Sequence, residues 1–269
     1  MRIMNKLEKL EKILRRMESA VVAFSGGLDS SFLLKVANDT LADGKLLAVT
    51  AVSDTYTRSE LDQAKRFTKA LGVRHRLIFT DEMKDRRFTK NPVDRCYYCK
   101  KELFKNLKDE ARRCGFKFIM DASNLDDKKD YRPGAKAKKE FRVRSPLQDA
   151  GLFKSDIRKY SKKLGMETWS LPPLACLASR IPYGKEISRD VLAKVEKAEG
   201  FIRALGIKHV RVRYHDDVAR IEVEKKDIKR FFNQRFCAKI VRRLRGLGFS
   251  YITLDLEGYR TGSLNEVLE

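Results

Sequence analysis

The sequence predicts an α/β protein in which a domain with a parallel sheet is followed by a smaller α/β domain. Three observations lead to this prediction. Short apolar runs alternate with segments of helical periodicity, as they do in parallel α/β sheets. The glycine pair Gly26 and Gly27 follows the first apolar run directly, and from Ser188 onward the chain repeats the alternation without a proline.

The first domain, residues 1–184, is expected to hold the parallel sheet. Expected strands are 20–24, 46–52, 74–79 and 116–121, and expected helices are 31–38, 59–71 and 101–113. Apolar residues at helical spacing through 7–17 indicate an amphipathic helix at the N-terminus instead of a signal peptide, so we expect a cytoplasmic protein. The segment 171–183 contains three prolines, which are too many for a regular element.

The second domain, residues 185–269, is expected to be a smaller α/β unit. Expected helices are 191–205 and 227–244, and expected strands are 209–214, 219–223 and 251–254. The densest basic run, Lys225 to Arg245, carries nine basic residues and one acid. Its apolar residues recur at helical spacing, so we expect a packed helix with a basic solvent face before a nucleic-acid interface.

The chain is strongly basic. Its 269 residues contain 59 Lys and Arg against 37 Asp and Glu, a net charge of +22. This excess favours polyanionic partners but does not choose among them, and a salt-rich or hot cytoplasm also tolerates basic surfaces. No stretch approaches the roughly 20 apolar residues of a membrane span, so no membrane partner is expected.

The segment 25–30, Ser-Gly-Gly-Leu-Asp-Ser, is a candidate phosphate-binding loop. Paired glycines after a strand permit positive φ and a close approach of backbone N–H groups to an anion, and the next helix adds its positive end. The loop lacks the Gly-Lys-Ser/Thr ending of a Walker loop, so it supplies no lysine to the phosphates. Asp29 is instead suited to hold Mg²⁺ or a phosphate-bound water, and the alternative is an ordinary tight turn.

The five cysteines, at 96, 99, 114, 176 and 237, suggest a metal or redox site. Disulfides are unexpected in a chain without export signals, and Cys114 and Cys237 fit packing positions. Cys96 and Cys99, just before the expected helix 101–113, form a Cys-x-x-Cys that suits a metal or a redox dithiol. The three histidines, at 75, 209 and 215, lack the spacing of zinc ligands. With Cys176, three thiolates suit a [4Fe–4S] cluster that has one open iron.

The loop is a complete match to the PP-loop pattern Ser-Gly-Gly-x-Asp-Ser, and so resembles a superfamily that cleaves ATP between the α and β phosphates. The resemblance implies ATP and Mg²⁺ as cofactors and adenylation of a carboxyl or carbonyl oxygen. The residues expected to hold the nucleotide phosphates are Ser25, Gly26, Gly27, Asp29 and Ser30. Asn124 and Asp126 resemble the superfamily's second nucleotide loop at the end of a later strand, although a plain turn is the alternative.

Further motifs resemble the LarE family of sulfur transferases along nearly the whole chain. They are Pro-Pro-Leu-Ala-Cys-Leu-Ala-Ser-Arg-Ile-Pro-Tyr-Gly at 172–184, Arg-Cys-Tyr-Tyr-Cys-Lys at 95–100, Asp-Tyr-Arg-Pro-Gly at 130–134, Arg-Val-Arg at 211–213 and Ala-Arg-Ile-Glu-Val at 219–223. This family makes the nickel-pincer nucleotide cofactor. The resemblance implies adenylation of the carboxylates of pyridinium-3,5-biscarboxylic acid mononucleotide, followed by their conversion to thiocarboxylates.

Cys176 matches the family's sulfur-handling cysteine. In one branch that cysteine surrenders its own sulfur, whereas a second branch uses three cysteines to bind an iron–sulfur cluster. Cys96 and Cys99 place this chain with the second branch, where sulfide or another donor would supply the sulfur. A persulfide relay on the Cys-x-x-Cys is the alternative. The family resemblance also implies a homo-oligomer, a trimer or a hexamer.

Four basic residues complete the expected site. Arg180 is expected to steer a substrate phosphate or carboxylate, and Lys101 to neutralise charge near the adenylate. Arg211 and Arg213 alternate along a strand and face one side, where they bind the substrate's phosphate or meet acids across the sheet. Glu222 and Asp255 are weaker candidates for metal or subunit contacts.

Three other functions remain open from the sequence. A tRNA thiolase would use the same ATP chemistry, although we find no recognisable RNA-binding module. An amidating synthetase also carries a PP-loop but needs ammonia instead of a three-cysteine centre. A nucleotide-responsive binding protein would bind ATP without releasing pyrophosphate.

Overall fold

The computed structural model describes residues 5–128, 131–260 and 262–268. Two compact units divide the chain: the first comprises Met1–Glu82 and Asp94–Leu174, and the second comprises Met83–Val93 and Ala175–Glu269. The expected domain boundary at 184/185 remains a prediction about independent folding. Asp130, part of one family motif, lies outside the described residues.

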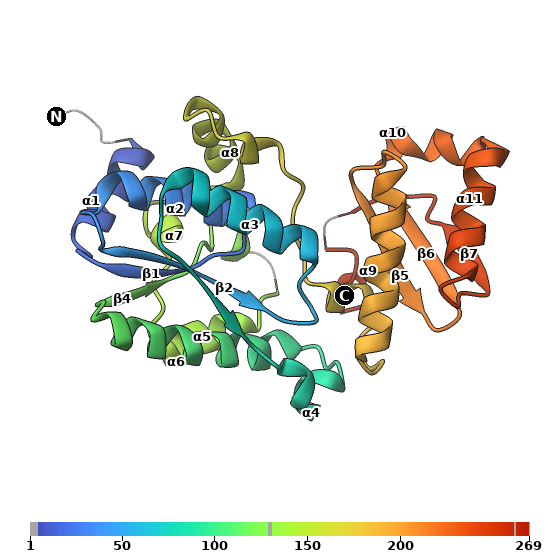
Figure 1. Cartoon of the computed structure of the whole chain (residues 1–269), viewed down its shortest axis with the longest axis horizontal. Helices are drawn as coiled ribbons and strands as arrows, with labels where there is room; N and C mark the ends of the chain where they lie inside the picture. The colour runs from blue at the N-terminus through green and yellow to red at the C-terminus, as the bar shows by residue number, and fades with distance from the viewer. Residues whose placement is uncertain (1–4, 129–130, 261, 269) are drawn as a thin grey trace. The chain divides into compact units, whose positions relative to one another are not determined.

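The first unit contains the predicted parallel sheet (Figure 1). Its strands are β1 (Ala20–Ala23), β2 (Leu46–Val52), β3 (His75–Phe79) and β4 (Phe118–Met120), in the order β3-β2-β1-β4. All three pairings are parallel, which confirms the predicted α/β class. The chain runs from β1 out to β3 and then returns to the other side of β1. The connections therefore diverge between β1 and β4, where open α/β sheets bind their ligands.

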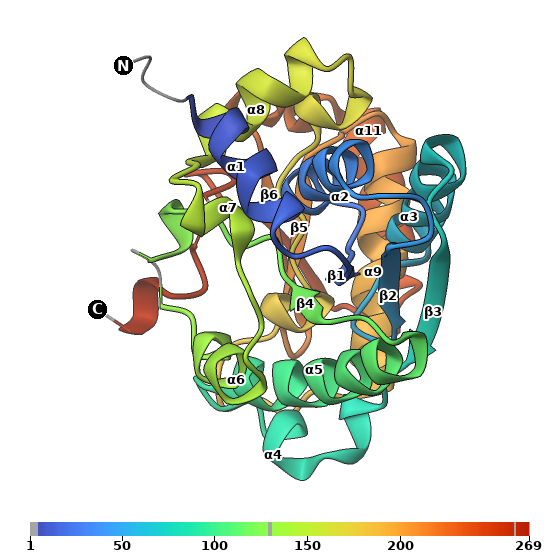
Figure 2. The same cartoon turned by 90° about the vertical axis from the view of Figure 1, so that its left-hand side faces the viewer.

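Helices cover both faces of this sheet, as Figure 2 shows. On one face lie α1 (Lys6–Arg15), α2 (Leu28–Thr40), α3 (Arg58–Leu71), α7 (Pro146–Asp149) and α8 (Lys154–Lys163), and on the other lie α5 (Arg95–Cys114) and α6 (Gly134–Phe141). Phe32 and Leu34 fill the first core layer, while Phe104 and Leu107 fill the second. Burial on both faces explains why β1 and β2 read as continuous apolar runs.

Short helical segments also occur between Glu82 and Arg180. They are α4 (Arg86–Thr89) and the 3₁₀ segments η1 (Glu82–Lys84), η2 (Asp126–Lys128), η3 (Glu167–Ser170) and η4 (Leu177–Arg180). Two of them, α4 and η4, belong to the second unit. The irregular, proline-rich stretch expected at 171–183 contains η4 as its only regular element among the described residues.

The second unit contains a three-stranded sheet in the order β5-β6-β7. Its elements are α9 (Arg189–Ala204), β5 (Val210–His215), β6 (Val218–Val223), α10 (Lys225–Ile228), η5 (Lys229–Phe232), α11 (Gln234–Arg245), β7 (Tyr251–Leu254) and η6 (Glu266–Leu268). β5 and β6 are antiparallel, whereas β6 and β7 are parallel. Val212 and Ile221 pack with α9 and α11 on one face, so the charged residues that alternate with them lie on the other face.

The basic run is not the single helix predicted for 227–244. The chain forms α10 and η5, breaks at Asn233, and then starts α11. Asn233 is the N-cap, because its side chain accepts the backbone N–H of Phe236. Phe232, expected in the packed face, is 81% exposed. The apolar periodicity continues across the break, but the Asn233 cap starts a new helix there, which the periodicity does not reveal.

Two helices of the first unit begin three or more residues earlier than predicted. α2 starts at Leu28 because Gly27 is its N-cap, so the phosphate loop leads into the helix without a spacer. α5 starts at Arg95, so Cys96 and Cys99 lie on its first turn and not in a preceding loop. Residues three apart on a helix share one side, and the two thiols therefore belong to the same face of α5. Among the described residues, none of the helices combines the length and apolar character that crossing a bilayer demands.

Candidate active site

The phosphate loop joins β1 to α2 at the carboxyl edge of the parallel sheet. Gly26 has φ +73°, and a Cβ on it would lie 3.2 Å from the backbone of Ala64 on α3. Gly27 is the N-cap of α2, and within the described part of the chain no side chain caps that helix end. Its first N–H groups and the positive end of the helix dipole are therefore suited to an anion.

The two serines of the loop hold its shape. The hydroxyl oxygens of Ser25 and Ser30 lie 3.0 Å apart, and the Ser30 hydroxyl donates to the Gly27 carbonyl at 3.1 Å. Gln63 on α3 donates to the Gly26 carbonyl at 2.6 Å, and the hydroxyl of Tyr56, which precedes α3, donates to the Ser25 carbonyl. The carbonyls of Ser25 and Gly26 therefore accept hydrogen bonds from the side of the loop that faces α3.

Asp29, in the first turn of α2, has two differently satisfied carboxylate oxygens. Its Oδ2 lies 2.6 Å from Nζ of Lys154 and also accepts the Asn124 amide at 3.4 Å. Its Oδ1 is buried and has no hydrogen-bond partner among the described residues. Burial raises the pKa of Asp29, and the charge of Lys154 opposes that rise. Since carboxylate oxygens are ligands of Mg²⁺, the unsatisfied Oδ1 fits a metal-binding role for Asp29.

The loop after β4, which we expect to be the second nucleotide loop, lies beside Asp29. Asn124 is 2% exposed, and its side chain accepts the backbone N–H of Asp126 at 2.9 Å. Asp126 in turn accepts the backbone N–H of Lys154 at 2.7 Å. The two loops that were expected to share the nucleotide therefore meet at the point where the sheet connections diverge.

Lys154 is a site residue that the sequence analysis missed. It begins α8 and lies 125 positions from Asp29, in a segment without a recognisable motif. No local pattern indicated it, because its relevance arises only when α8 packs on the same sheet face as α2.

A second polar cluster follows β4. Asp121 accepts hydrogen bonds from Ser123 at 2.6 Å and from Ser145 at 2.5 Å. Lys138, from α6, donates to both of these hydroxyls at 3.0 Å. This network of hydrogen bonds fixes the start of the Asn124 loop, so Asp121 has a structural role in holding that loop.

Lys101, which we expect near the adenylate, contacts two other side chains of the protein. Its Nζ lies 3.3 Å from the Tyr97 hydroxyl and 3.7 Å from the Glu140 carboxylate on α6. These contacts raise the pKa of Lys101, chiefly through the hydrogen bond with Tyr97. The role of Lys101 at the nucleotide remains a prediction.

The three cysteines of interest carry thiols and form no disulfide within the described residues. Cys96 and Cys176 are exposed and Cys99 is partly exposed. Cys96 and Cys99 belong to the first unit and Cys176 to the second. Within the described ranges, no three His, Cys, Asp or Glu side chains gather closely enough to hold a metal. Their thiols nonetheless have the donor chemistry of an iron–sulfur site, and two of them are already on one helix turn.

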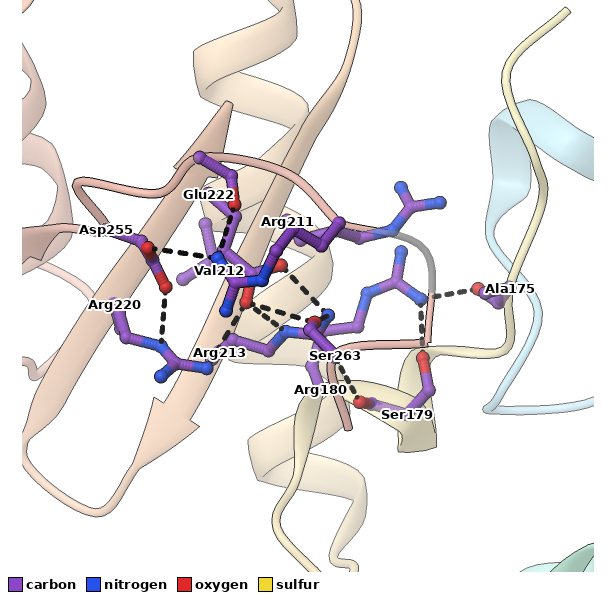
Figure 3. A network of polar contacts seen from close by, with 12 residues as sticks. Ala175, Ser179, Arg180, Arg211, Val212, Arg213, Arg220, Glu222, Asp255 and Ser263 are labelled. Atoms are coloured by element: carbon purple, nitrogen blue, oxygen red, sulfur yellow. Dashed lines mark hydrogen bonds and ion pairs between the residues drawn. The ribbon is translucent and has the colours of Figure 1, made fainter. Parts of the chain in front are cut away.

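Arg180 is buried under the Cys176 loop, where Figure 3 shows its contacts. Its guanidinium binds both carboxylate oxygens of Glu199, at 2.8 and 3.1 Å. It also donates to the Ala175 and Cys176 carbonyls, at 2.5 and 2.9 Å. The guanidinium that we expected to bind a substrate therefore binds Glu199 and two backbone carbonyls. This geometry favours a role for Arg180 in positioning Cys176.

Arg213 also meets an acid across the sheet, the second of the two expectations for it (Figure 3). It binds the buried Glu222 through two hydrogen bonds of 2.9 Å and donates to the Ser179 carbonyl at 2.7 Å. Ser263 accepts a further hydrogen bond at 2.6 Å. Glu222 therefore forms ion pairs with Arg213 and Arg220.

Arg211 is placed differently from Arg213. It is 8% exposed, and its guanidinium lies 5.6 Å from the ring centre of Tyr259. Burial and the nearby charge of Arg180 lower the pKa of Arg211. The carboxylate of Glu199 has the opposite effect on this pKa. Asp255, the last of the weaker candidates, lies 3.7 Å from Arg220 and 3.4 Å from Arg260.

Comparison with known proteins assigns the chain to a family. The asparagine synthase family model matches residues 8–89, the part that contains the phosphate loop. A pyridinium-3,5-bisthiocarboxylic acid mononucleotide synthase from Lactiplantibacillus plantarum is 39% identical over 257 residues, 95% of this chain and 92% of that protein. An uncharacterized protein of Synechocystis is 41% identical, covering 98% of both chains, and one of Methanocaldococcus jannaschii is 31% identical, covering 96% of this chain and 98% of its own. The chain therefore belongs to the LarE family of pyridinium-3,5-bisthiocarboxylic acid mononucleotide synthases, within the PP-loop superfamily of ATP-dependent, AMP-forming enzymes.

Proposed function

We propose that this chain activates the carboxylates of pyridinium-3,5-biscarboxylic acid mononucleotide with ATP and replaces one oxygen of each by sulfur. The observation that carries the proposal is the 39% identity to the named synthase along 95% of the chain. In the first step a carboxylate oxygen attacks the α-phosphorus, the bond to the bridging oxygen breaks, and pyrophosphate leaves. In the second step a sulfur nucleophile attacks the acyl carbon and AMP leaves, so a thiocarboxylate remains.

The phosphate loop would serve the first step. The N–H groups of the loop and of the first turn of α2 bind the departing pyrophosphate, and the hydroxyls of Ser25 and Ser30 keep the loop in shape. Asp29 would hold Mg²⁺, which neutralises charge on the leaving group when bound. Asn124 and Asp126 would border the nucleotide from the neighbouring loop.

The Cys176 loop would serve the second step. Arg180 holds the carbonyls of this loop and so positions the exposed thiol of Cys176. Arg211 would supply positive charge for the substrate's phosphate, Arg213 would lie beside it while paired with Glu222, and Lys101 would supply charge for the adenylate.

Cys96, Cys99 and Cys176 would hold a [4Fe–4S] cluster. Such a cluster, bound by three thiolates with one open iron, would supply a sulfide ligand for transfer. A regenerable sulfur source permits repeated turnover, whereas the loss of a cysteine's own sulfur ends activity after one transfer. Free sulfide is the simplest donor that would reload it.

The test of the reaction measures pyrophosphate and product together. Protein, MgATP, sulfide and the pyridinium mononucleotide are incubated anaerobically, and the product is identified by its mass. Pyrophosphate release that depends on the mononucleotide, with a sulfur-for-oxygen exchange in it, is the expected result. Sulfur incorporated into tRNA, or turnover with ammonia and no sulfur, would replace the proposal by a tRNA thiolase or an amidating synthetase.

The test of the cluster measures iron and sulfide in anaerobically purified protein. About four irons per protomer are expected, and C96A, C99A and C176A should each lower that number. C237A is the control, since Cys237 donates to the Phe231 carbonyl within its own unit. A colourless protein in which Cys176 loses its sulfur during a single turnover would assign the chain to the sacrificial branch.

Assembly and location complete the proposal. We expect a cytoplasmic homo-oligomer, and light scattering coupled to gel filtration separates a trimer or a hexamer from a monomer. A monomer that is fully active in the assay above would remove the oligomer from the proposal.

A further inference from the structure

We propose that Lys154 is an exchangeable counterion of the phosphate loop: it neutralises Asp29 until metal and ATP bind, and it then binds the ATP phosphates. This inference rests on the use of MgATP, which the family assigns, and not on the identity of the sulfur acceptor. It gives the loop the lysine that its sequence lacks, from a helix far along the chain.

The first argument is the contact itself. Nζ of Lys154 lies 2.6 Å from Oδ2 of Asp29, and the two side chains are 34% and 20% exposed. The pair is therefore partly shielded from water at the N-terminal turn of α2, where the polyphosphate is expected. Because Asp29 stands at that turn, an incoming phosphate meets its negative charge unless a cation lies between them.

The second argument is that the two carboxylate oxygens of Asp29 differ in their hydrogen bonding. Lys154 and Asn124 both contact Oδ2, while the buried Oδ1 has no partner among the described residues. Buried acceptors without a partner are rare and mark places where a ligand binds. A divalent cation accepts electron pairs from carboxylate oxygens and carries twice the charge of the ammonium, so it is the better partner for Asp29 once phosphates complete its shell.

The third argument is that Lys154 is anchored at its backbone and flexible at its tip. Its N–H is held by Asp126 at 2.7 Å, and three residues later Ile157 is fully buried in the core. The lysine side chain has a flexible aliphatic stem that turns about this anchor. A cation displaced from Asp29 by the metal therefore stays at the loop, beside the phosphates.

The experiment compares Lys154→Met with Lys163→Met, an exposed lysine on the same helix. Mn²⁺ binding without nucleotide is measured by electron paramagnetic resonance, and MgATP binding by calorimetry. Loss of the competing ammonium should tighten Mn²⁺ binding by several-fold, while loss of the phosphate contact should weaken MgATP binding about tenfold. Lys163→Met should change neither quantity.

The opposite signs separate the proposal from a structural role. A lysine that only holds α8 in place would, on removal, weaken both ligands and lower the melting temperature, and that result would overturn the proposal. Unchanged Mn²⁺ affinity in Lys154→Met would overturn it as well. Lys154→Arg should restore most of the MgATP affinity, since it keeps the charge. These measurements need no sulfur acceptor, so a chain that binds MgATP in this way but fails to thiolate the pyridinium mononucleotide would refute only the function proposed above.

Discussion

Arg180 and Glu199 form a buried ion pair in which two guanidinium nitrogens bind the two carboxylate oxygens at 2.8 and 3.1 Å. Arg203 binds the same carboxylate at 2.5 Å, and the backbone N–H of Val212 donates to it at 3.1 Å. The pair therefore ties the Cys176 loop to both α9 and β5. Burial acts to raise the pKa of Glu199. The positive charge of Arg180 outweighs this effect, with help from Arg211 and Arg203, and the pKa lies below its usual value.

Glu199→Gln should destabilise the second unit strongly. It removes the carboxylate charge that pairs with the buried Arg180, and breaking a buried pair in this way costs about 3–5 kcal/mol in proteins. Urea unfolding followed by circular dichroism measures the loss. Glu186→Gln, an exposed acid in the same unit, is the control and should stay within about 0.5 kcal/mol of wild type. Equal stability of the two variants would show that the pair contributes nothing to the fold.

His75 should make the first unit sensitive to acid. It lies between the hydroxyls of Thr50 and Thr68, at 2.8 and 3.0 Å, and burial lowers its pKa. Below the usual histidine pKa of about 6.5, the unfolded chain binds a proton that the folded protein does not. The free energy of unfolding should therefore fall as the pH drops from neutral to about 5.

The measurement compares this pH slope with that of His75→Gln, which does not titrate. The variant should be less stable at neutral pH but should lose less stability on acidification. Parallel curves for the two proteins would assign the acid sensitivity to other groups.

Gly26→Ala should impair ATP binding more than it impairs folding. Gly26 has φ +73°, and the added Cβ lies 3.2 Å from Ala64, so the loop must move away from α3. Gly44→Ala is a matched control, because Gly44 has φ +74° with nothing within 4 Å. Both variants pay the cost of a left-handed alanine, about 1–2 kcal/mol.

Calorimetry should show MgATP affinity lowered about tenfold or more for Gly26→Ala and unchanged for Gly44→Ala. If Gly26→Ala bound MgATP as tightly as wild type, the loop would not be the phosphate site.

Asn233→Ala tests the break in the basic run. The side chain of Asn233 caps α11, so its removal should cost about 1 kcal/mol. Asn233→Gly should cost only a few tenths of that, since glycine also suits a cap position. Thermal melting of both variants distinguishes them, and an alanine variant as stable as wild type would indicate a continuous helix.

The sequence alone determined the features that depend on neighbouring residues. Alternating apolar runs predicted all four parallel strands, and the paired glycines after the first of them located the phosphate loop. α3 begins at the capping box of Thr57 and ends at Gly72, a left-handed C-cap. The helix end predicted at Gly72 fits this. Asn124 and Asp126 could be expected beside the loop because the carboxyl ends of parallel strands share one edge of the sheet.

Tertiary structure alone decided which charges are buried and which residues they meet. A basic residue reads alike in sequence whether it lies in water or against a buried acid, so the sequence did not show that Arg180 binds Glu199, and it left open whether Arg213 meets a substrate or an acid such as Glu222. Lys154 reaches Asp29 across 125 positions, a contact created by the packing of α8 beside α2. Periodicity and spacing act over a few turns of chain, whereas desolvation and pairing depend on the whole core, and only the folded protein specifies them.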